Sequence, residues 1–428
     1  MTKVFTLWKF NDVLTLSYGF DSISAVFLTA IVVLWICAGV YSVFYMKDKE
    51  HLRRYYTFYF ILFCVMCLMA LSANLFTFYM NYELMTIVST PLVLHEQTKE
   101  ARRAGFKYLM YSFFGAYFVL FGFYVLNKYC VSLEFTYGGT LNMTAVAGHE
   151  GFVRLAVFFM ILGFGVKAGM WPMHAWLTAA HPIAVSPASA VLSGVIVKAG
   201  ATGILRTVYY LVGADFIRGT WVQTAWMCLA LVTVLMGSML AYFEPVLKRR
   251  LAYSTVSQVS YILFGLSILN ETGFEGALLQ FEAHAFAKCA LFLIAGALIM
   301  VTGTTRVDEM GAVGKKYPLL MWCYVAASLS MIGIPPTGGF LSKWYIMVAS
   351  VNEGISVLYW LGPVILLVSA LLTAGYLLPL AIKGFLPGEG YEAEGKVKKL
   401  PATCVVPIAV LTALALMVGI VPGIFPGL

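Results

Sequence analysis

The chain has 428 residues, of which 61% are hydrophobic and 11% are charged. Soluble domains carry about 25% charged residues, and a soluble fold of this size would not expose so much apolar surface. The apolar residues come in long blocks, near or above the ~20 residues with which a helix crosses a bilayer. The ~10-residue alternating segments of a β-barrel do not occur. These features exclude a soluble protein and predict an all-α polytopic membrane protein.

Taken in chain order, the apolar blocks predict about twelve transmembrane helices. The segment before the first helix, Met1–Phe20, has no continuous apolar run ahead of a small-residue cleavage site, so no cleavable signal peptide is expected. No linker divides the chain, and only the loops near 127–152 and 383–402 are long. The predicted spans are 21–46, 55–77, 79–95, 106–128, 153–177, 187–210, 222–243, 253–270, 277–301, 317–348, 357–382 and 403–425.

The basic residues gather in alternate loops, and this predicts the orientation in the cell (inner, cytoplasmic) membrane. The positive-inside rule places these loops in the cytoplasm. The N-terminus then lies outside and, after an even number of spans, the C-terminus does too. The net charge of +8 comes from these scattered flanking residues, which give a nucleic-acid partner no support. The basic side carries Lys47, Lys49, Arg53, Arg54, Lys99, Arg102, Arg103, Lys107, Lys248, Arg249, Arg250, Arg306, Lys315, Lys316, Lys383, Lys396, Lys398 and Lys399. The other side carries Lys3, Lys9, Lys128, Arg154 and Arg218, with Arg206 near that end of its span.

Four further lysines, Lys167, Lys198, Lys288 and Lys343, lie inside apolar blocks. A charge at mid-membrane costs at least about 3 kcal/mol, so such residues usually face a bundle interior or a water-filled cavity. A single lysine of this kind can be explained structurally: its ammonium is hydrogen-bonded by backbone carbonyls, or its side chain extends to the membrane surface. Four of them in one bundle indicate an ion path instead.

Glu83 is a lone carboxylate in the apolar run NLFTFYMNYELMTIVSTPLVL. Such a group is either neutral or paired with a cation. Our hypothesis is that Glu83 pairs with one of the membrane lysines. Because burial disfavours a charged lysine and a nearby carboxylate favours it, changes in this pairing would switch the lysine between holding and releasing a proton.

Two spans are interrupted by proline at mid-membrane. Pro172 follows Lys167 in the first, and Pro335 and Pro336 precede Lys343 in the second. Proline breaks a helix, and carbonyls freed at that depth must be buried in protein or line a cavity. In transporters, broken helices with ionisable residues mark ion sites. The breaks are five spans apart, an odd number that inverts the helix direction. This predicts two inverted five-helix repeats, 55–210 and 222–382, between a first segment, 1–54, and a final loop and span, 383–428.

Histidines add titratable groups near these lysines. His284 and Lys288 are four residues apart on one helix face, so they are a candidate proton relay; alternatively, His284 is a core residue with one hydrogen bond. Glu282 points to another face and is assigned no role. His174 follows the first break and His181 ends the same span. Both are candidates for proton access or gating, with anchoring of the loop as an alternative for His181.

No cofactor or metal site is expected. The sequence has no Gly-rich phosphate loop at a strand–helix junction and no paired C-x-x-C motifs for an iron–sulfur cluster. Its one C-x-x-C, Cys64 and Cys67, lies inside the run ILFCVMCLMA and is interpreted as two buried thiols that act as small hydrophobic residues. We therefore expect no active site within this chain.

These residues resemble a known family. The stretch GFGVKAGMWPMHAWLTAAHPIAVSPASAVLSGVIVKAGATGILR, which ends at Arg206, is similar to the signature of the antiporter-like proton-conducting subunits of respiratory complex I. The family includes subunits of membrane-bound hydrogenases, formate hydrogenlyases and Mrp-type sodium/proton antiporters. The blocks NYELMTIVSTPLV, KRRLAYSTVSQ, EAHAFAKCALFLIAG and GIPPTGGFLSKWYI also agree. Tyr82, Thr178 and Ala283 stand where Trp, Pro and Asn are common, but no ionisable relay residue is lost.

The resemblance implies a role for each buried group. Glu83 would be the carboxylate partner of Lys167, and Lys198 would bridge two half-channels. Family members commonly carry two more N-terminal helices, and the distal complex I subunit also has a long C-terminal lateral helix. We expect this chain to lack both. His284 and Lys288 would form a central relay. Lys343 would be the terminal lysine, from which the proton leaves to the outside.

Two functions remain open at this stage. The first is an ion-translocating subunit of a redox-driven complex, with further antiporter-like membrane subunits and a peripheral redox module as partners. The second is a subunit of an Mrp-type antiporter without redox chemistry. A scaffold that has lost conduction is disfavoured because it has no need for four intramembrane lysines, and nothing excludes a related role in inorganic-carbon uptake. Lysine and histidine favour protons as the ion, because sodium prefers clustered oxygen ligands.

Overall fold

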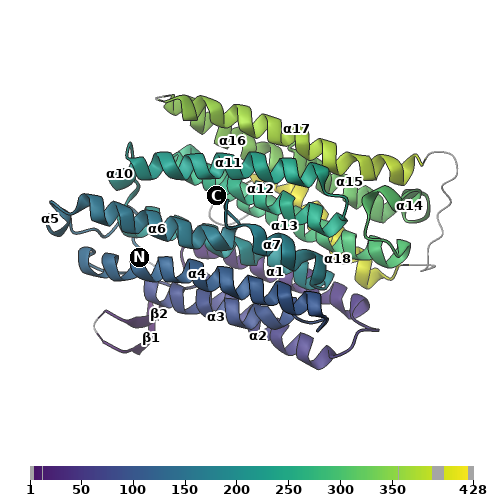
Figure 1. Cartoon of the computed structure of the whole chain (residues 1–428), viewed down its shortest axis with the longest axis horizontal. Coiled ribbons are helices and arrows are strands. Elements are labelled where there is room, and N and C mark those ends of the chain that lie inside the picture. Colours follow the sequence, from purple (N-terminus) through teal and green to yellow (C-terminus); the bar gives the residue numbers. More distant parts are fainter. Residues whose placement is uncertain (1–3, 12, 355, 388–399, 423–428) are drawn as a thin grey trace.

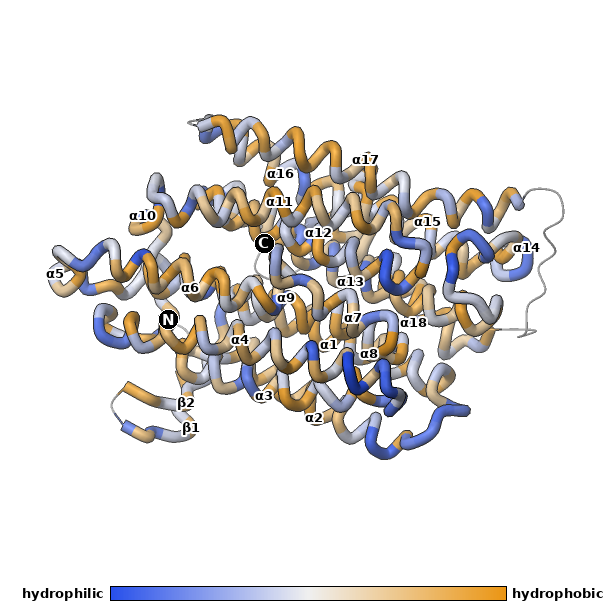
Figure 2. The backbone as a smooth tube through the Cα atoms, in the orientation of Figure 1, coloured by the Kyte–Doolittle hydropathy of each residue, from blue (hydrophilic) through white to orange (hydrophobic). Residues whose placement is uncertain are grey.

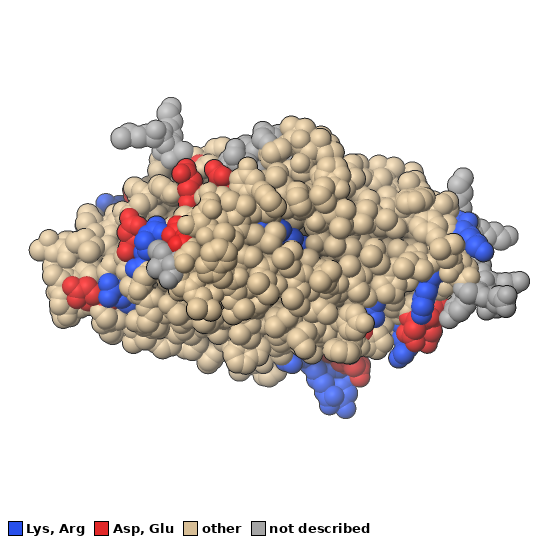
Figure 3. Space-filling model, turned by 90° about the horizontal axis from the view of Figure 1, so that it is seen from above, with Lys and Arg blue, Asp and Glu red and all other residues tan. Residues whose placement is uncertain are grey.

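The computed structural model describes residues 4–11, 13–354, 356–387 and 400–422. Its long helices lie side by side along the longest axis of the molecule (Figure 1). Hydrophilic residues gather toward the two ends of this bundle and apolar residues dominate between them (Figure 2). On the face shown in Figure 3, a wide belt between the ends is almost free of charged residues. The basic residues Lys3, Lys396, Lys398 and Lys399, and with them part of the segment 383–428, lie outside the described residues.

Helices make up most of the described chain. Several begin at a side-chain cap of the kind that satisfies a free backbone N–H: Asp21 accepts from Ser24 N (2.8 Å) at the start of α1, and Asn270 from Gly273 N (2.8 Å) at the start of α13. In chain order the elements are α1 (Ser22–Tyr45), α2 (Leu52–Ala70), α3 (Leu75–Val93), α4 (Lys99–Tyr129), α5 (Met143–Val146), α6 (Glu150–Ala168), α7 (Ala175–Ile183), α8 (Ser186–Val191), the π-helical turn η1 (Leu192–Ile196), α9 (Val197–Leu205), the π-helical turn η2 (Arg206–Val212), α10 (Ala214–Ile217), α11 (Trp221–Phe243), α12 (Leu247–Ser267), α13 (Glu271–Thr302), the 3-10 turn η3 (Val307–Glu309), α14 (Val313–Lys316), α15 (Pro318–Ile332), α16 (Gly338–Glu353), α17 (Val357–Phe385) and α18 (Ala402–Ile420).

Nine helices of the described chain are long and apolar enough to cross a membrane: α1, α2, α4, α6, the continuous run 186–212, α11, α13, α17 and α18. The predicted all-α polytopic membrane fold is therefore confirmed. The other predicted spans match α3, α12 and the pair α15–α16. α3 carries Asn81 and Glu83, α12 begins with the basic residues after Leu247, and α15 and α16 are each short. The full count of twelve remains a prediction.

The N-terminal residues form a small β-hairpin that the sequence did not reveal. Strand β1 (Phe5–Lys9) pairs antiparallel with β2 (Thr15–Tyr18), with Phe5 opposite Tyr18 and a register shift between Thr6 and Trp8. The backbone N–H of Ser17 donates to Thr77 Oγ1 (2.9 Å), at the start of α3. The hairpin is thus attached to the end of the bundle where α1 and α3 begin (Figure 1).

The centre of the bundle is formed by α13 and the run 186–212. The membrane-length window of 186–212 is entirely buried, and that of α13 is 83% buried. α13 packs against α1, α8, α12, α15, α16 and α18. Polar side chains on these helices must therefore find their partners inside the protein. This places Lys198, His284 and Lys288 in the interior.

The two predicted helix breaks are present. α6 ends at Ala168, where Gly169 has φ +79°, and α7 begins six residues later. α15 ends at Ile332, where Gly333 has φ +94°, and α16 begins at Gly338. A positive φ at each break favours glycine, which has no Cβ to clash with the backbone. The two broken helices run in opposite directions along the bundle (Figure 1), as inverted repeats require. The repeats 55–210 and 222–382 themselves remain a prediction.

A buried ion pair joins α1 to η2. Arg206 opens η2, is 3% exposed, and donates to both carboxylate oxygens of Asp21, at 2.5 and 2.8 Å. It also donates to Ser24 Oγ (3.3 Å). Its guanidinium lies near the rings of Phe135 (4.9 Å) and Tyr210 (4.7 Å). Arg206 was recognised in the sequence only as a residue near the outer end of its span.

Replacing Asp21 by Asn is expected to lower the unfolding temperature of the detergent-purified protein at pH 7. Removing one partner of a fully buried ion pair costs about 3–5 kcal/mol, and the cost here is smaller because the Asp21 side chain is 28% exposed. Thermal unfolding of the wild type and of Asp21→Asn, measured side by side, checks this.

The same pair gives a pH dependence. Burial raises the pKa of Asp21, but the hydrogen bond and charge of Arg206 outweigh it and leave the pKa below its ordinary value. A carboxyl of this kind stabilises the fold above its unfolded pKa of about 3.9, and the contribution is lost as the pH falls through the folded pKa. The difference between wild type and Asp21→Asn should therefore shrink only below about pH 4. Equal unfolding temperatures at pH 7 would show that the pair does not stabilise the fold.

Candidate ion pathway

Lys167 lies in the last turn of α6 and is completely buried. Its ammonium donates to three hydroxyls on α3 and α4: Thr86 Oγ1 (2.8 Å), Ser112 Oγ (2.9 Å) and Tyr108 OH (3.0 Å). It also lies 4.4 Å from the centre of the Tyr108 ring. A lysine has three N–H donors, so all three are satisfied by neutral groups. Such a site binds the ammonium group but contains no anion that would keep the lysine permanently protonated.

Glu83 does not form the direct ion pair with Lys167 that we hypothesised. Among the described residues, no ion pair within 4 Å joins the two groups. Glu83 lies one helical turn before Thr86, which accepts a hydrogen bond from Lys167. Its Oε1 is buried and has no hydrogen-bond partner among the described residues. The carboxylate therefore lies on the same helix as Thr86 but takes no part in the hydrogen bonds of the lysine.

Lys198 is held by the π-helical turn η1. Its ammonium donates to the carbonyls of Ser193 (3.1 Å) and Gly194 (2.5 Å), and it lies 5.8 Å from the centre of the Phe281 ring. A π-turn changes the regular hydrogen-bond pattern of a helix and often occurs at functional sites. Here the turn presents backbone oxygens to a lysine at the centre of the bundle.

Lys288 and His284 face the same side of α13, but no hydrogen bond joins them. Lys288 donates to Ser254 Oγ (2.8 Å) and to the Leu251 carbonyl (3.2 Å) on α12. Tyr376 on α17 donates to the same Ser254 oxygen (2.7 Å). Neither ring nitrogen of His284 has a hydrogen-bond partner among the described residues, so the interpretation as a core histidine with one hydrogen bond does not fit. Its polar atoms are free for water or for a proton.

A hydroxyl pair connects the surroundings of Lys198 and Lys288. The Ser193 and Thr255 hydroxyls lie 2.7 Å apart, and Thr255 also donates to the Leu251 carbonyl (3.0 Å). Ser193 contributes a carbonyl to Lys198, and Leu251 contributes one to Lys288. The two lysines thus share one polar network across η1, α12 and α13.

Lys343 occupies the second break. It donates to the carbonyls of Met331 (2.5 Å) and Ile332 (2.8 Å), the last residues of α15. It is 5% exposed and lies 5.1 Å from the centre of the Tyr261 ring. The broken helix therefore supplies oxygens to a lysine at mid-bundle, as the proline pattern predicted.

Two glutamines that the sequence reasoning missed lie next to Lys343. Gln258 donates to the Met331 carbonyl (3.3 Å) and accepts from Gln280 (2.9 Å), whose Oε1 accepts from Ser342 (2.6 Å). Gln280 precedes His284 by one turn of α13, so it links the histidine and the terminal lysine. An amide inside an apolar block is the signal that would have found both residues.

Three buried charged groups also went unassigned. Lys248, counted as a loop residue, is 7% exposed and donates to the Ala184 carbonyl (2.9 Å) after α7. Glu282 is 1% exposed, and its two oxygens have no hydrogen-bond partner among the described residues. Arg206 is the third. The flanking position of Lys248 and Arg206 in the sequence concealed their burial.

The two histidines of the first broken helix differ in environment. His181 is completely buried near the end of α7 and stacks on Phe292 with 4.5 Å between ring centres. Neither of its nitrogens has a hydrogen-bond partner in the described chain. His174 lies in the break, with 6.4 Å between its ring centre and that of Tyr253, and its Nδ1 also lacks a partner there. Loop anchoring through a hydrogen bond of the His181 ring is not seen. Proton access and gating remain predictions for both.

The C-x-x-C interpretation was wrong in one respect. Cys67 is half-buried, but Cys64 is exposed on the outer face of α2, and both are free thiols. On a helix with a membrane-facing side, an apolar run does not distinguish a residue that faces lipid from one that faces the core.

The bundle defines a class of protein: a polytopic membrane protein with buried lysines at helix breaks and on neighbouring helices. Comparison with known proteins gives the family. Residues 72–373 match the membrane family described as NADH:quinone oxidoreductase/Mrp antiporter. The chain belongs to this family.

Named relatives come from several kinds of complex. The chain is 31% identical over 411 residues to NADH-quinone oxidoreductase subunit N of Desulforudis audaxviator, covering 91% of this chain and 79% of that one. It is 32% identical to hydrogenase-4 component B of Escherichia coli, covering 95% and 62%. It is 29% identical to a Na+/H+ antiporter subunit of Alkalihalophilus pseudofirmus, covering 94% and 80%.

Solved structures share the fold. A chain of the Mrp complex from a Dietzia species superposes with a TM-score of 0.85 at 19% identity, covering 99% of this chain and 85% of that one. A chain of the membrane-bound sulfane sulfur reductase, an archaeal respiratory membrane complex, gives 0.85 at 22% identity, covering 98% and 83%.

Proposed function

We propose that the chain conducts protons through the membrane, as an ion-translocating subunit of a larger redox-driven complex. The observation that carries the proposal is the set of four interior lysines. Each is at most 5% exposed, and each is held only by hydroxyls or backbone carbonyls. Because none has a carboxylate within 4 Å in the described chain, none is locked in its charged form. A lysine of this kind is suited to gain and release a proton.

The proposed route follows the polar contacts. Glu83 acts on Lys167 from α3, one turn before Thr86. Lys198 joins the two halves through the Ser193–Thr255 pair, and the route continues through Lys288 and His284 to Lys343. Water completes the gaps between these groups. With the basic loops in the cytoplasm, Lys343 would release its proton toward the outside. The two termini would then also lie outside.

Protons are favoured over sodium by the chemistry of the groups. Ammonium groups donate hydrogen bonds and repel cations, whereas a sodium site needs converging oxygens. The carbonyls freed at η1 and at the second break are already occupied by Lys198 and Lys343. A second candidate, part of a sodium/proton antiporter without redox chemistry, is favoured by the similarity to the Na+/H+ antiporter protein of Alkalihalophilus pseudofirmus.

The test is to purify the tagged chain in mild detergent and to identify what accompanies it by mass spectrometry and metal analysis. We expect further membrane subunits of the same family together with a peripheral redox module that contains iron. Driven proton uptake is then measured in vesicles that contain the purified complex. Companions that are all membrane proteins without redox metal would overturn the redox-driven proposal in favour of the antiporter.

A further inference from the structure

One face of the helical run 186–212 leads from Lys198 toward the outer end of the bundle. Lys198, Thr202 and Arg206 follow one another at intervals of four residues, so they lie on roughly the same side. Lys198 is at mid-bundle, and Arg206 is paired with Asp21 at the start of α1. This line of three residues therefore runs along one helix from Lys198 to the outer end of that helix.

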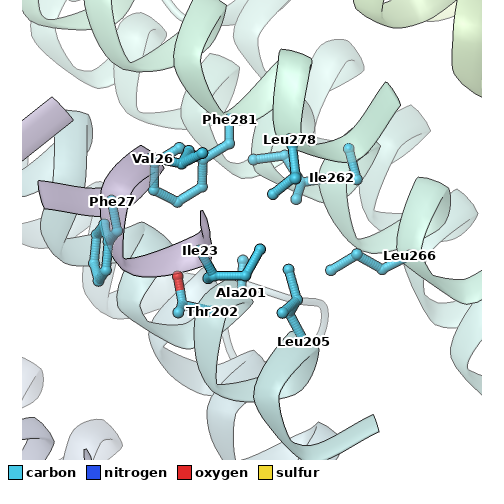
Figure 4. Close-up of a pocket in the computed structure, with 11 residues that line it drawn as sticks. Ile23, Val26, Phe27, Ala201, Thr202, Leu205, Ile262, Leu266, Leu278 and Phe281 are labelled. Atoms are coloured by element: carbon cyan, nitrogen blue, oxygen red, sulfur yellow. The ribbon is translucent and has the colours of Figure 1, made fainter. Parts of the chain in front are cut away.

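A small apolar cavity lies on this line (Figure 4). Its volume is about 10 Å³, close to the minimum that holds one water molecule. The Thr202 hydroxyl is the one side-chain polar group drawn around it (Figure 4). Apolar cavities of this kind stay dry. The remaining wall is aliphatic or aromatic and includes Ile23, Val26, Phe27, Leu278 and Phe281.

Phe281 separates the lysine from the cavity. Its ring lies 5.8 Å from Lys198 Nζ, borders the cavity, and packs edge-on against Phe27 with 5.4 Å between ring centres. Phe27 belongs to α1, so α1 provides one of the two rings that border the cavity. Arg206 follows Leu205, which also lines the cavity, and its charge is balanced by Asp21.

We propose that this face is a closed outward branch of the proton route, sealed by the Phe281–Phe27 pair and the dry cavity, with the Arg206–Asp21 ion pair at its outer end. We call it the outer seal. Hydrophobic constrictions block conduction by excluding water. The seal prevents a proton on Lys198 from passing directly to the outside. It must instead continue to Lys288 and Lys343. The inference rests on the proposed function of Lys198.

The experiment measures passive proton entry into vesicles that contain the purified complex without any energy source. Phe281→Ala removes the ring and joins the cavity to Lys198, so the passive proton leak should rise severalfold. Val26→Thr adds a hydroxyl to the cavity wall with little change in shape and should raise the leak without disturbing the packing. The matched control is Phe264→Ala, a fully buried phenylalanine that packs beside Gly362 of α17, off this line. Adding Lys198→Ala to Phe281→Ala should bring the leak back to the level of the control.

The outer seal is overturned if Phe281→Ala and Val26→Thr leak no more than Phe264→Ala, or if the leak of Phe281→Ala is unchanged by Lys198→Ala. Driven proton uptake is recorded in the same vesicles and tests the proposed function separately. A wild type that moves no protons when driven refutes that function, whatever the leak. A wild type that pumps, with no effect of Phe281→Ala on the leak, refutes the seal alone.

Discussion

Driven proton movement should fall roughly tenfold or more in Lys167→Ala, while the complex still assembles. Lys167 is the buried lysine that contacts the side chains of α3 and α4 near Glu83. Without it, the hydroxyls of Thr86, Tyr108 and Ser112 remain, but none of them takes up a proton near neutral pH. The route would be interrupted at this point.

The fold should tolerate this loss because two of the three neighbouring hydroxyls have other partners. Tyr108 OH lies 2.7 Å from Ser89 Oγ, and Thr86 donates to the Tyr82 carbonyl (3.3 Å). Removing the ammonium also removes a group that is costly to bury. Lys167→Met, which keeps the volume of the side chain, separates the loss of the charge from the loss of packing.

Proton uptake into vesicles and the subunit composition of the purified variants provide the measurement. The control is Lys49→Ala, which removes an exposed lysine paired with Glu96 at 2.8 Å and should leave transport unchanged. If Lys167→Ala and Lys167→Met built the full gradient, the assignment of Lys167 to the route would be wrong.

The sequence revealed the groups of the pathway better than their contacts. Lys198 and Lys343 were found because a charge inside an apolar block is rare for an energetic reason that holds in any membrane fold. The break at Pro335 was found because proline removes a backbone donor regardless of context. Such local penalties can be identified from one sequence. The all-α membrane fold was predictable for the same reason.

Contacts between distant segments were not predictable in this way. Whether Glu83 touches Lys167 depends on how α3 and α6 pack, and the hydroxyls of α3 and α4 occupy the position that the carboxylate was expected to take. The π-turn beneath Lys198 was not predicted, because such turns are rare and occur as single turns inside otherwise regular helices. Arg206 looked like a flanking residue because its partner, Asp21, is far away in the sequence.

Lys198 and Lys343 both bind backbone carbonyls, and each has two possible roles: to release a proton or only to bind these carbonyls. Lys343 is the better residue at which to separate the two roles. Arginine retains the charge and several N–H donors, so Lys343→Arg can still bond the Met331 and Ile332 carbonyls, but it does not release its proton in a protein. We expect Lys343→Arg to keep the stability of the complex and to lose driven proton movement by roughly tenfold or more. A lysine whose only task is to bind the broken end of α15 would instead be replaced by arginine without loss of transport.

Lys343→Ala completes the comparison. It leaves the Ile332 carbonyl without its side-chain donor, while the Met331 carbonyl keeps Gln258 (3.3 Å). A buried polar group left without a partner costs about 1–3 kcal/mol, so Lys343→Ala should unfold at a lower temperature than both the wild type and Lys343→Arg. Unfolding temperature and driven proton uptake, measured on the same three preparations, then separate the two roles. Transport retained in Lys343→Arg would exclude proton release from Lys343, whereas transport lost in a stable Lys343→Arg variant would require it, because the arginine differs from the lysine chiefly in being unable to give up its charge.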